Sequence, residues 1–189
     1  MGEEGSSSGS NAKVLLTQAL LAASGFRGLP LAQKKGPKFA VPAFSISLLA
    51  GCVGFLEKLT GNETIAKLDK YTSSLCSTMV VPLVASEICL KHGVQLEMAA
   101  ANIVYPTIHY IFKNFLENED YVKDGYLEIS HTISLAIMAY FSFQDSQKWG
   151  ITMSLGYVLS SLAHKMTDDE QAKTLVLALA NCIYALKVL

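Results

Sequence analysis

The dominant pattern along this chain is a run of apolar positions without any charge. Residues 39–56, FAVPAFSISLLAGCVGFL, are 18 consecutive uncharged positions, preceded by lysines and followed by Glu57 and Lys58. An apolar run of about this length is sufficient for one helix to cross the hydrocarbon core of a bilayer. Residues 39–56 therefore predict either a membrane-spanning helix or the central helix of a protein core.

Two later segments, residues 95–116 and 146–165, repeat apolar side chains every three or four positions, as one face of a helix does. Such a stripe favours a helix that turns its apolar face toward a protein core. The first stripe consists of Val104, Ile108, Ile111, Phe112 and Phe115, and the second of Ile151, Leu155, Val158, Leu159 and Leu162.

Helical patterns also cover residues 12–24, 63–70, 73–91 and 127–144, and a last segment that ends near residue 188. Gly25 is expected to end the first of these helices, residues 27–38 to form a basic loop, and Asn62 to cap the short helix after it. No alternating strand pattern of useful length occurs. The sequence therefore predicts an all-α bundle of six to seven helices in a single domain, residues 12–189, preceded by a disordered polar tail, residues 1–11.

The chain has few charges with which to cover the outside of such a bundle. Charged residues make up 16% of it, against about 25% in typical soluble domains. Helices that face lipid need no charged cover, so the deficit favours a multi-pass membrane protein, in a membrane whose organelle the sequence does not identify. The formal net charge of −1 provides no basic field for nucleic acid.

The uncharged runs after residue 56 are shorter, at about 13 to 16 residues, which is nearer the length of a buried core helix. Two alternatives therefore remain beside the membrane hypothesis. One is a soluble all-α bundle that binds an apolar ligand or an apolar partner, and the other is a protein that lies on a lipid surface.

Small residues recur four positions apart in two of the expected helices. Ser47 with Gly51, and Ala50 with Gly54, form two such pairs, and Gly156 with Ser160 forms a third. Small residues at this spacing let a second helix approach closely within a membrane. They predict helix-packing positions, with membrane lipid and the helices of a partner protein as the expected contacts; the other interpretation is ordinary small residues at a helix crossing.

Glu87 and His131 are the titratable residues of most interest if the helices lie in a membrane. An ionisable side chain at membrane depth is costly and is a candidate for function, although Lys91 lies four positions after Glu87 and can pair with it. These two residues motivate a further hypothesis, an intramembrane enzyme or transporter.

The sequence contains no recognisable catalytic motif, no cofactor fingerprint and no set of three or four metal ligands at a known spacing. We therefore expect no catalytic, cofactor or metal site. The leading hypothesis is a small multi-pass membrane protein with a structural or accessory role through helix–helix packing.

Overall fold

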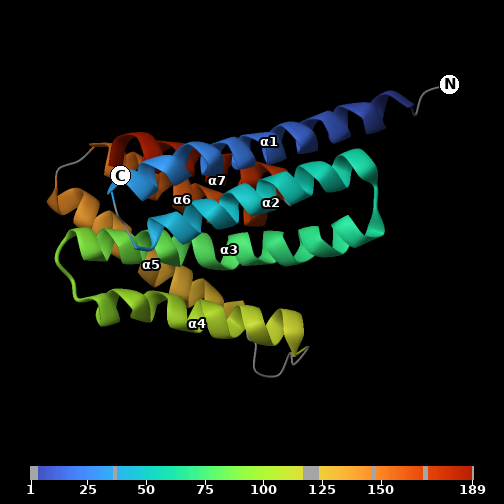
Figure 1. Cartoon of the computed structure of the whole chain (residues 1–189). Coiled ribbons are helices and arrows are strands. Elements are labelled where there is room, and N and C mark those ends of the chain that lie inside the picture. The colour runs from blue at the N-terminus through green and yellow to red at the C-terminus, as the bar shows by residue number, and fades with distance from the viewer. Residues whose placement is uncertain (1–3, 36–37, 117–123, 146–147, 168–169, 189) are drawn as a thin grey trace.

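The computed structural model describes residues 4–35, 38–116, 124–145, 148–167 and 170–188 (Figure 1). All regular secondary structure in these ranges is helical, which confirms the all-α prediction. Seven α-helices follow one another, and the last continues into a short π-helix. They are α1 (Glu4–Lys35), α2 (Ala40–Thr60), α3 (Glu63–Lys91), α4 (Leu96–Phe115), α5 (Asp124–Gln144), α6 (Lys148–Thr167), α7 (Glu170–Ile183) and η2 (Tyr184–Val188).

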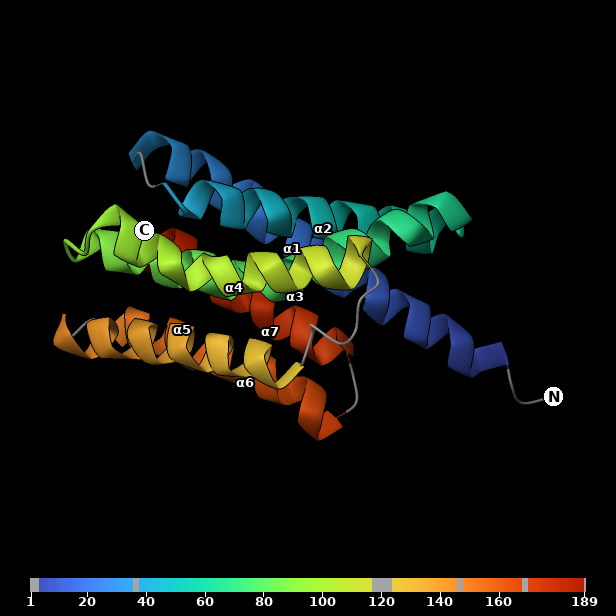
Figure 2. The same ribbon diagram turned by 90° about the horizontal axis from the view of Figure 1, so that it is seen from below.

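The helices lie roughly along one direction and enclose a common core (Figures 1 and 2). Helix α2 packs between α1 and α3, α5 packs on α3, and α6 packs on α5. Helix α7 packs on both α6 and α1, which closes a ring of six helices, while α4 lies against α3 and α5. Helix α3 is the most enclosed, because residues 78–89 on it are buried without interruption.

Helix α1 differs from its prediction at both ends. It begins at Glu4, within the residues expected to be disordered, and its N-terminal part extends past the end of α2 (Figure 1). It also continues through Gly25 and the expected loop 27–38 as far as Lys35, so the predicted helix end and most of the predicted loop are wrong.

The glycines of α1 serve a close helix crossing instead of a helix end. A Cβ atom on Gly25 would lie 2.5 Å from the backbone nitrogen of Leu48, and one on Gly28 would lie 2.3 Å from the ring of Phe44. No side chain larger than hydrogen fits at either position unless α2 moves away. Tertiary packing therefore explains both glycines.

Residues 63–91 form one helix where two were expected. The predicted cap is confirmed, because the Oδ1 atom of Asn62 accepts a hydrogen bond of 2.8 Å from the backbone N–H of Thr64. Pro82 lies inside the helix and is fully buried. The break expected between residues 70 and 73 does not occur.

Three helical segments are long and apolar enough to cross a membrane: Asn11–Lys34, Ala40–Thr60 and Glu63–Lys91. Helices α4, α5 and α6 are not among these three segments, but each has 20 or 21 residues. At 1.5 Å per residue, such a helix is about 30 Å long, close to the thickness of the hydrocarbon core.

The apolar stripes of α4 and α6 face outward. On α4, Val104 is 55% exposed and Phe115 is 65% exposed, whereas His109 on the opposite face is 2% exposed. On α6, Leu155 and Leu159 are also exposed. The interpretation of these stripes as core-facing is therefore wrong. The inward face of α6 carries Met153, Ser154, Tyr157 and Ser160.

Candidate functional site

Polar side chains meet in the interior of the bundle, between α2, α6 and α7. The hydroxyl group of Tyr157 donates a hydrogen bond of 2.6 Å to the Oδ1 atom of Asn181, and the Nδ2 atom of Asn181 donates one of 3.1 Å to the Oγ atom of Ser47. All three residues are at most 1% exposed. A buried amide without partners would be costly, so this chain of hydrogen bonds fixes how the three helices sit against one another.

Glu87 supplies the missing cap of another helix. Helix α2 has no acidic residue in its first turn, and the side chain of its N-cap residue, Phe39, makes no capping hydrogen bond. The Oε2 atom of Glu87, on α3, accepts hydrogen bonds from the backbone N–H groups of Phe39 at 2.6 Å and of Ala40 at 3.2 Å. A carboxylate is favourable there because helix N-termini carry unpaired N–H groups and a partial positive charge.

Lys91 does not pair with Glu87 as the sequence suggested. Its Nζ atom donates a hydrogen bond of 2.6 Å to the backbone carbonyl of Val188. Close by, the ring of Tyr184 stacks on that of Phe44, with 5.6 Å between ring centroids. These contacts attach η2 to the end of the bundle at which α2 begins and α3 ends.

The small residues of α2 contact a helix of the same chain. Ser47, Ala50, Gly51 and Gly54 are all buried. A Cβ atom on Gly51 would lie 2.3 Å from the backbone nitrogen of Ala22 on α1, and one on Gly54 would lie 2.7 Å from the side chain of Gln18. Helix α1 therefore occupies the face that the sequence analysis assigned to a partner protein.

The third small pair lies at the crossing of α6 and α7. A Cβ atom on Gly156 would lie 3.1 Å from the Cβ atom of Ala180, and the hydroxyl group of Ser160 donates a hydrogen bond of 3.0 Å to the carbonyl of Lys173.

His131 lies on α5 and is half-buried against α3. Its Nε2 atom is 3.1 Å from the carbonyl oxygen of Thr78. Glu87 lies on α3 and binds the start of α2, whereas His131 contacts α3 at Thr78, and the structure does not join the two side chains into one site. Within the described ranges, no three His, Cys, Asp or Glu side chains are grouped so that they could hold a metal ion.

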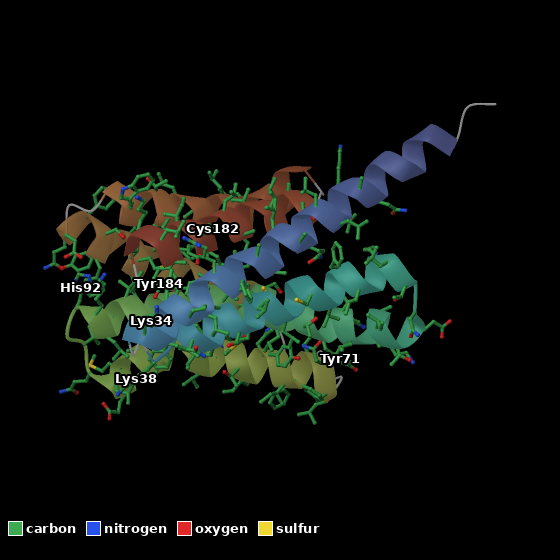
Figure 3. All side chains as sticks on the ribbon, turned by 45° about the horizontal axis from the view of Figure 1, so that its top comes forward. Lys34, Lys38, Tyr71, His92, Cys182 and Tyr184 are labelled. Atoms are coloured by element: carbon green, nitrogen blue, oxygen red, sulfur yellow. The ribbon has the colours of Figure 1, made fainter. Side chains whose placement is uncertain are left out.

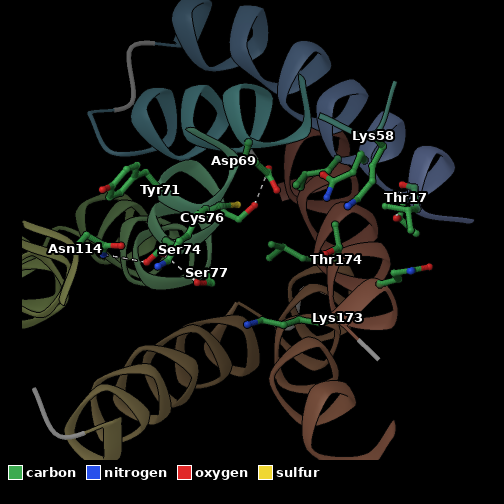
Figure 4. Close-up of a pocket in the computed structure, with 18 of the residues that line it drawn as sticks. Thr17, Lys58, Asp69, Tyr71, Ser74, Cys76, Ser77, Asn114, Lys173 and Thr174 are labelled. Atoms are coloured by element: carbon green, nitrogen blue, oxygen red, sulfur yellow. Dashed lines mark hydrogen bonds between the residues drawn. The ribbon is translucent and has the colours of Figure 1, made fainter. Parts of the chain in front are cut away.

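A polar cavity of about 1350 Å³ lies at the other end of the bundle, where α2 ends and α3 and α7 begin (Figure 4). Residues of α1, α2, α3, α4 and α7 line it, among them Lys58, Ser74, Asn114 and Lys173. The sequence analysis did not identify this cavity, because its walls come from five separate helices.

The Tyr157–Asn181 contact was also missed, although one signal for it was present. Asn181 is a lone amide in the apolar segment LVLALANCIYAL. A buried amide needs hydrogen-bonding partners, so this residue alone indicates a polar contact inside the bundle.

The fold and these contacts define an α-helical bundle with three helices able to cross a membrane and a hydrogen-bonded interior. Comparison of the chain with protein-family models, with curated proteins and with solved structures gives no match.

Proposed function

We propose that this chain is a multi-pass membrane protein with a structural or accessory role, in which the bundle exposes apolar faces to lipid and keeps its polar groups inside. This proposal rests on the apolar stripes of α4 and α6, which face outward. The opposite face of each helix carries small polar and other buried side chains. In water the same arrangement would expose large apolar patches. In lipid the exposed apolar side chains are solvated by acyl chains, and polar groups such as those of Tyr157, Asn181 and Ser47 stay paired inside the bundle.

The distribution of charges supports the same proposal. The central segments 71–86, 98–112, 129–144, 149–162 and 174–186 contain no Asp, Glu, Lys or Arg. Lys34, Lys38 and His92 lie together at one end of the bundle, and Tyr71 lies toward the other end (Figure 3). An uncharged belt between two more polar ends is the pattern that a bilayer requires.

A structural role agrees with the contacts that the polar groups make. Ser47, Asn181 and Tyr157 hold three helices together, and Glu87 caps α2. Because α1 covers Gly51 and Gly54, a partner helix would dock on the outward stripes of α4 and α6, where apolar side chains such as Val104 and Leu155 are exposed.

Carbonate extraction of membranes from cells that express the whole chain tests membrane insertion directly. Retention in the pellet after extraction is the expected result, since an inserted bundle cannot leave the bilayer without exposing its apolar faces. Release of the whole protein into the supernatant would contradict the proposal.

Cysteine accessibility tests which faces contact lipid. In a variant without the four native cysteines, Val104→Cys and Leu155→Cys place thiols on the outward stripes, and Gln95→Cys places one at an exposed helix end. The membranes are first opened so that the reagent reaches both of their sides. A membrane-impermeant maleimide should then label Gln95→Cys. It should leave both stripe thiols unmodified until detergent is added. Rapid labelling of the stripe thiols in intact membranes would show that these faces contact water.

A further inference from the structure

The cavity at the α2–α3 end of the bundle is positively charged, although the chain as a whole is not. Four lysines and one aspartate are among the residues that line it, whereas the whole chain has a net charge of −1. The four lysines, Lys58, Lys70, Lys113 and Lys173, come from four different helices. The fold therefore gathers positive charge that is scattered along the sequence.

Lys173 is the lysine that points to a ligand. Its side chain extends from α7 into the cavity (Figure 4). It is half-buried. No carboxylate in the described part of the chain lies within ion-pairing distance of its Nζ atom. A partly desolvated ammonium group without a counter-charge favours an anion beside it.

Two acidic residues near the cavity, within the part of the chain that the structure describes, contact groups other than Lys173. The Oδ1 atom of Asp69 accepts a hydrogen bond of 3.2 Å from the hydroxyl group of Ser73. Glu57 forms an ion pair of 2.8 Å with Lys58. Neither carboxylate neutralises Lys173.

Further groups complete a site for an anion with an apolar part. The Oγ atom of Ser74 accepts a hydrogen bond of 3.1 Å from Asn114, which leaves its own proton for donation into the cavity. Buried apolar side chains line the same space, namely Leu21, Ala50 and Leu177. An ammonium group, a hydroxyl donor and an apolar wall together suit a phosphate group that carries a hydrocarbon chain.

We propose that the cavity binds a phosphate group at Lys173, with Lys58 and the Ser74 hydroxyl as further contacts. The phosphate can belong to a phospholipid headgroup or to a soluble phosphate. The site goes beyond the proposed function, because the cavity would attract phosphate in water as well. Release of the protein by carbonate together with phosphate binding would therefore overturn the membrane proposal and leave this one standing.

Calorimetric titration of the whole chain, purified in a zwitterionic detergent, tests the proposal. The three probes are dihexanoyl phosphatidic acid, dihexanoyl phosphatidylcholine and inorganic phosphate. The variants are Lys173→Gln, Lys173→Arg, Lys58→Gln, and Lys34→Gln as the control at the opposite end of the bundle (Figure 3).

Saturable binding of phosphatidic acid, without binding of inorganic phosphate, would support the proposal and identify a lipid as the source of the phosphate group. Saturable binding of both phosphatidic acid and inorganic phosphate would support the proposal with a soluble source. In either case Lys173→Gln should weaken binding at least about tenfold, as expected for one lost charge-assisted hydrogen bond. Lys173→Arg should retain binding, and Lys58→Gln should weaken it in a background that keeps Lys173. Absence of saturable binding of both anionic probes, or equal weakening by Lys173→Gln and Lys34→Gln, would overturn the proposal.

Discussion

Replacing Glu87 by alanine should destabilise the bundle more than any surface substitution. The change removes the acceptor of two backbone N–H groups at the start of α2, those of Phe39 and Ala40. Among the residues that the structure describes, Glu87 supplies the side-chain hydrogen bonds at this helix end. Ala40 is fully buried, so water cannot readily replace the carboxylate at its N–H group.

The expected loss follows from the two hydrogen bonds. Hydrogen bonds to a charged group contribute about 1.5–3 kcal/mol each, so the free energy of unfolding should fall by about 3–6 kcal/mol for the two. For a domain of about 150–250 residues this corresponds to a fall of roughly 6–24 °C in the unfolding temperature. Glu87→Gln keeps one acceptor oxygen and loses only the attraction of the charge for the helix end, so its cost should be about 1–2 kcal/mol.

Thermal unfolding of the detergent-purified variants, followed by circular dichroism at 222 nm, measures this effect. Glu97→Ala is the matched control, because Glu97 also lies in the first turn of a helix but is exposed. Its cost should stay below about 1 kcal/mol. Equal unfolding temperatures for Glu87→Ala and Glu97→Ala would refute the assignment of Glu87 as the cap of α2.

Two further substitutions test the packing inside the bundle by the same measurement. Gly51→Leu should lower the free energy of unfolding by about 3 kcal/mol or more, because its Cβ atom would lie 2.3 Å from the backbone of α1. Gly125→Leu is the control, because the space around Gly125 is open. Similar stability of the two variants would contradict the close crossing of α1 and α2. Tyr157→Phe should cost about 1–3 kcal/mol, because it leaves the buried Oδ1 atom of Asn181 without this donor. Tyr140→Phe at an exposed position should change stability by less than about 0.5 kcal/mol, and an equal effect of the two changes would count against the interior hydrogen bonds.

The sequence was sufficient to predict features that depend on neighbouring residues. The helical spacing of apolar positions identified most of the helices, and Asn62 was recognised as a cap because the N–H group that it binds lies two residues away. Periodicity, however, shows only that a helix has two unlike faces. It does not show which face meets the core, and for this reason the stripe at Val104–Phe115 was assigned the wrong way round.

The features that the sequence could not indicate join residues far apart in the chain. Glu87 caps a helix that begins 47 residues before it, and no local pattern connects the two positions. Gly25 was interpreted as a helix end because glycine is common there, whereas the structure uses it where α1 and α2 nearly touch. The cavity around Lys173 likewise exists only after five helices have assembled.

The hydrogen bond between Asn181 and Ser47 has a consequence for the order in which the chain can assemble. The two residues are 134 positions apart, and α7 leaves the ribosome only after the six helices before it. Until then Ser47 lacks the Asn181 amide and Tyr157 lacks its acceptor, while the side of α1 that α7 covers stays open. Helices α1 and α2 can associate early through their glycine contacts, but synthesis of α7 is needed to lock them to α6. A chain that ends before α7 would therefore lack the Asn181 amide that joins Tyr157 on α6 to Ser47 on α2.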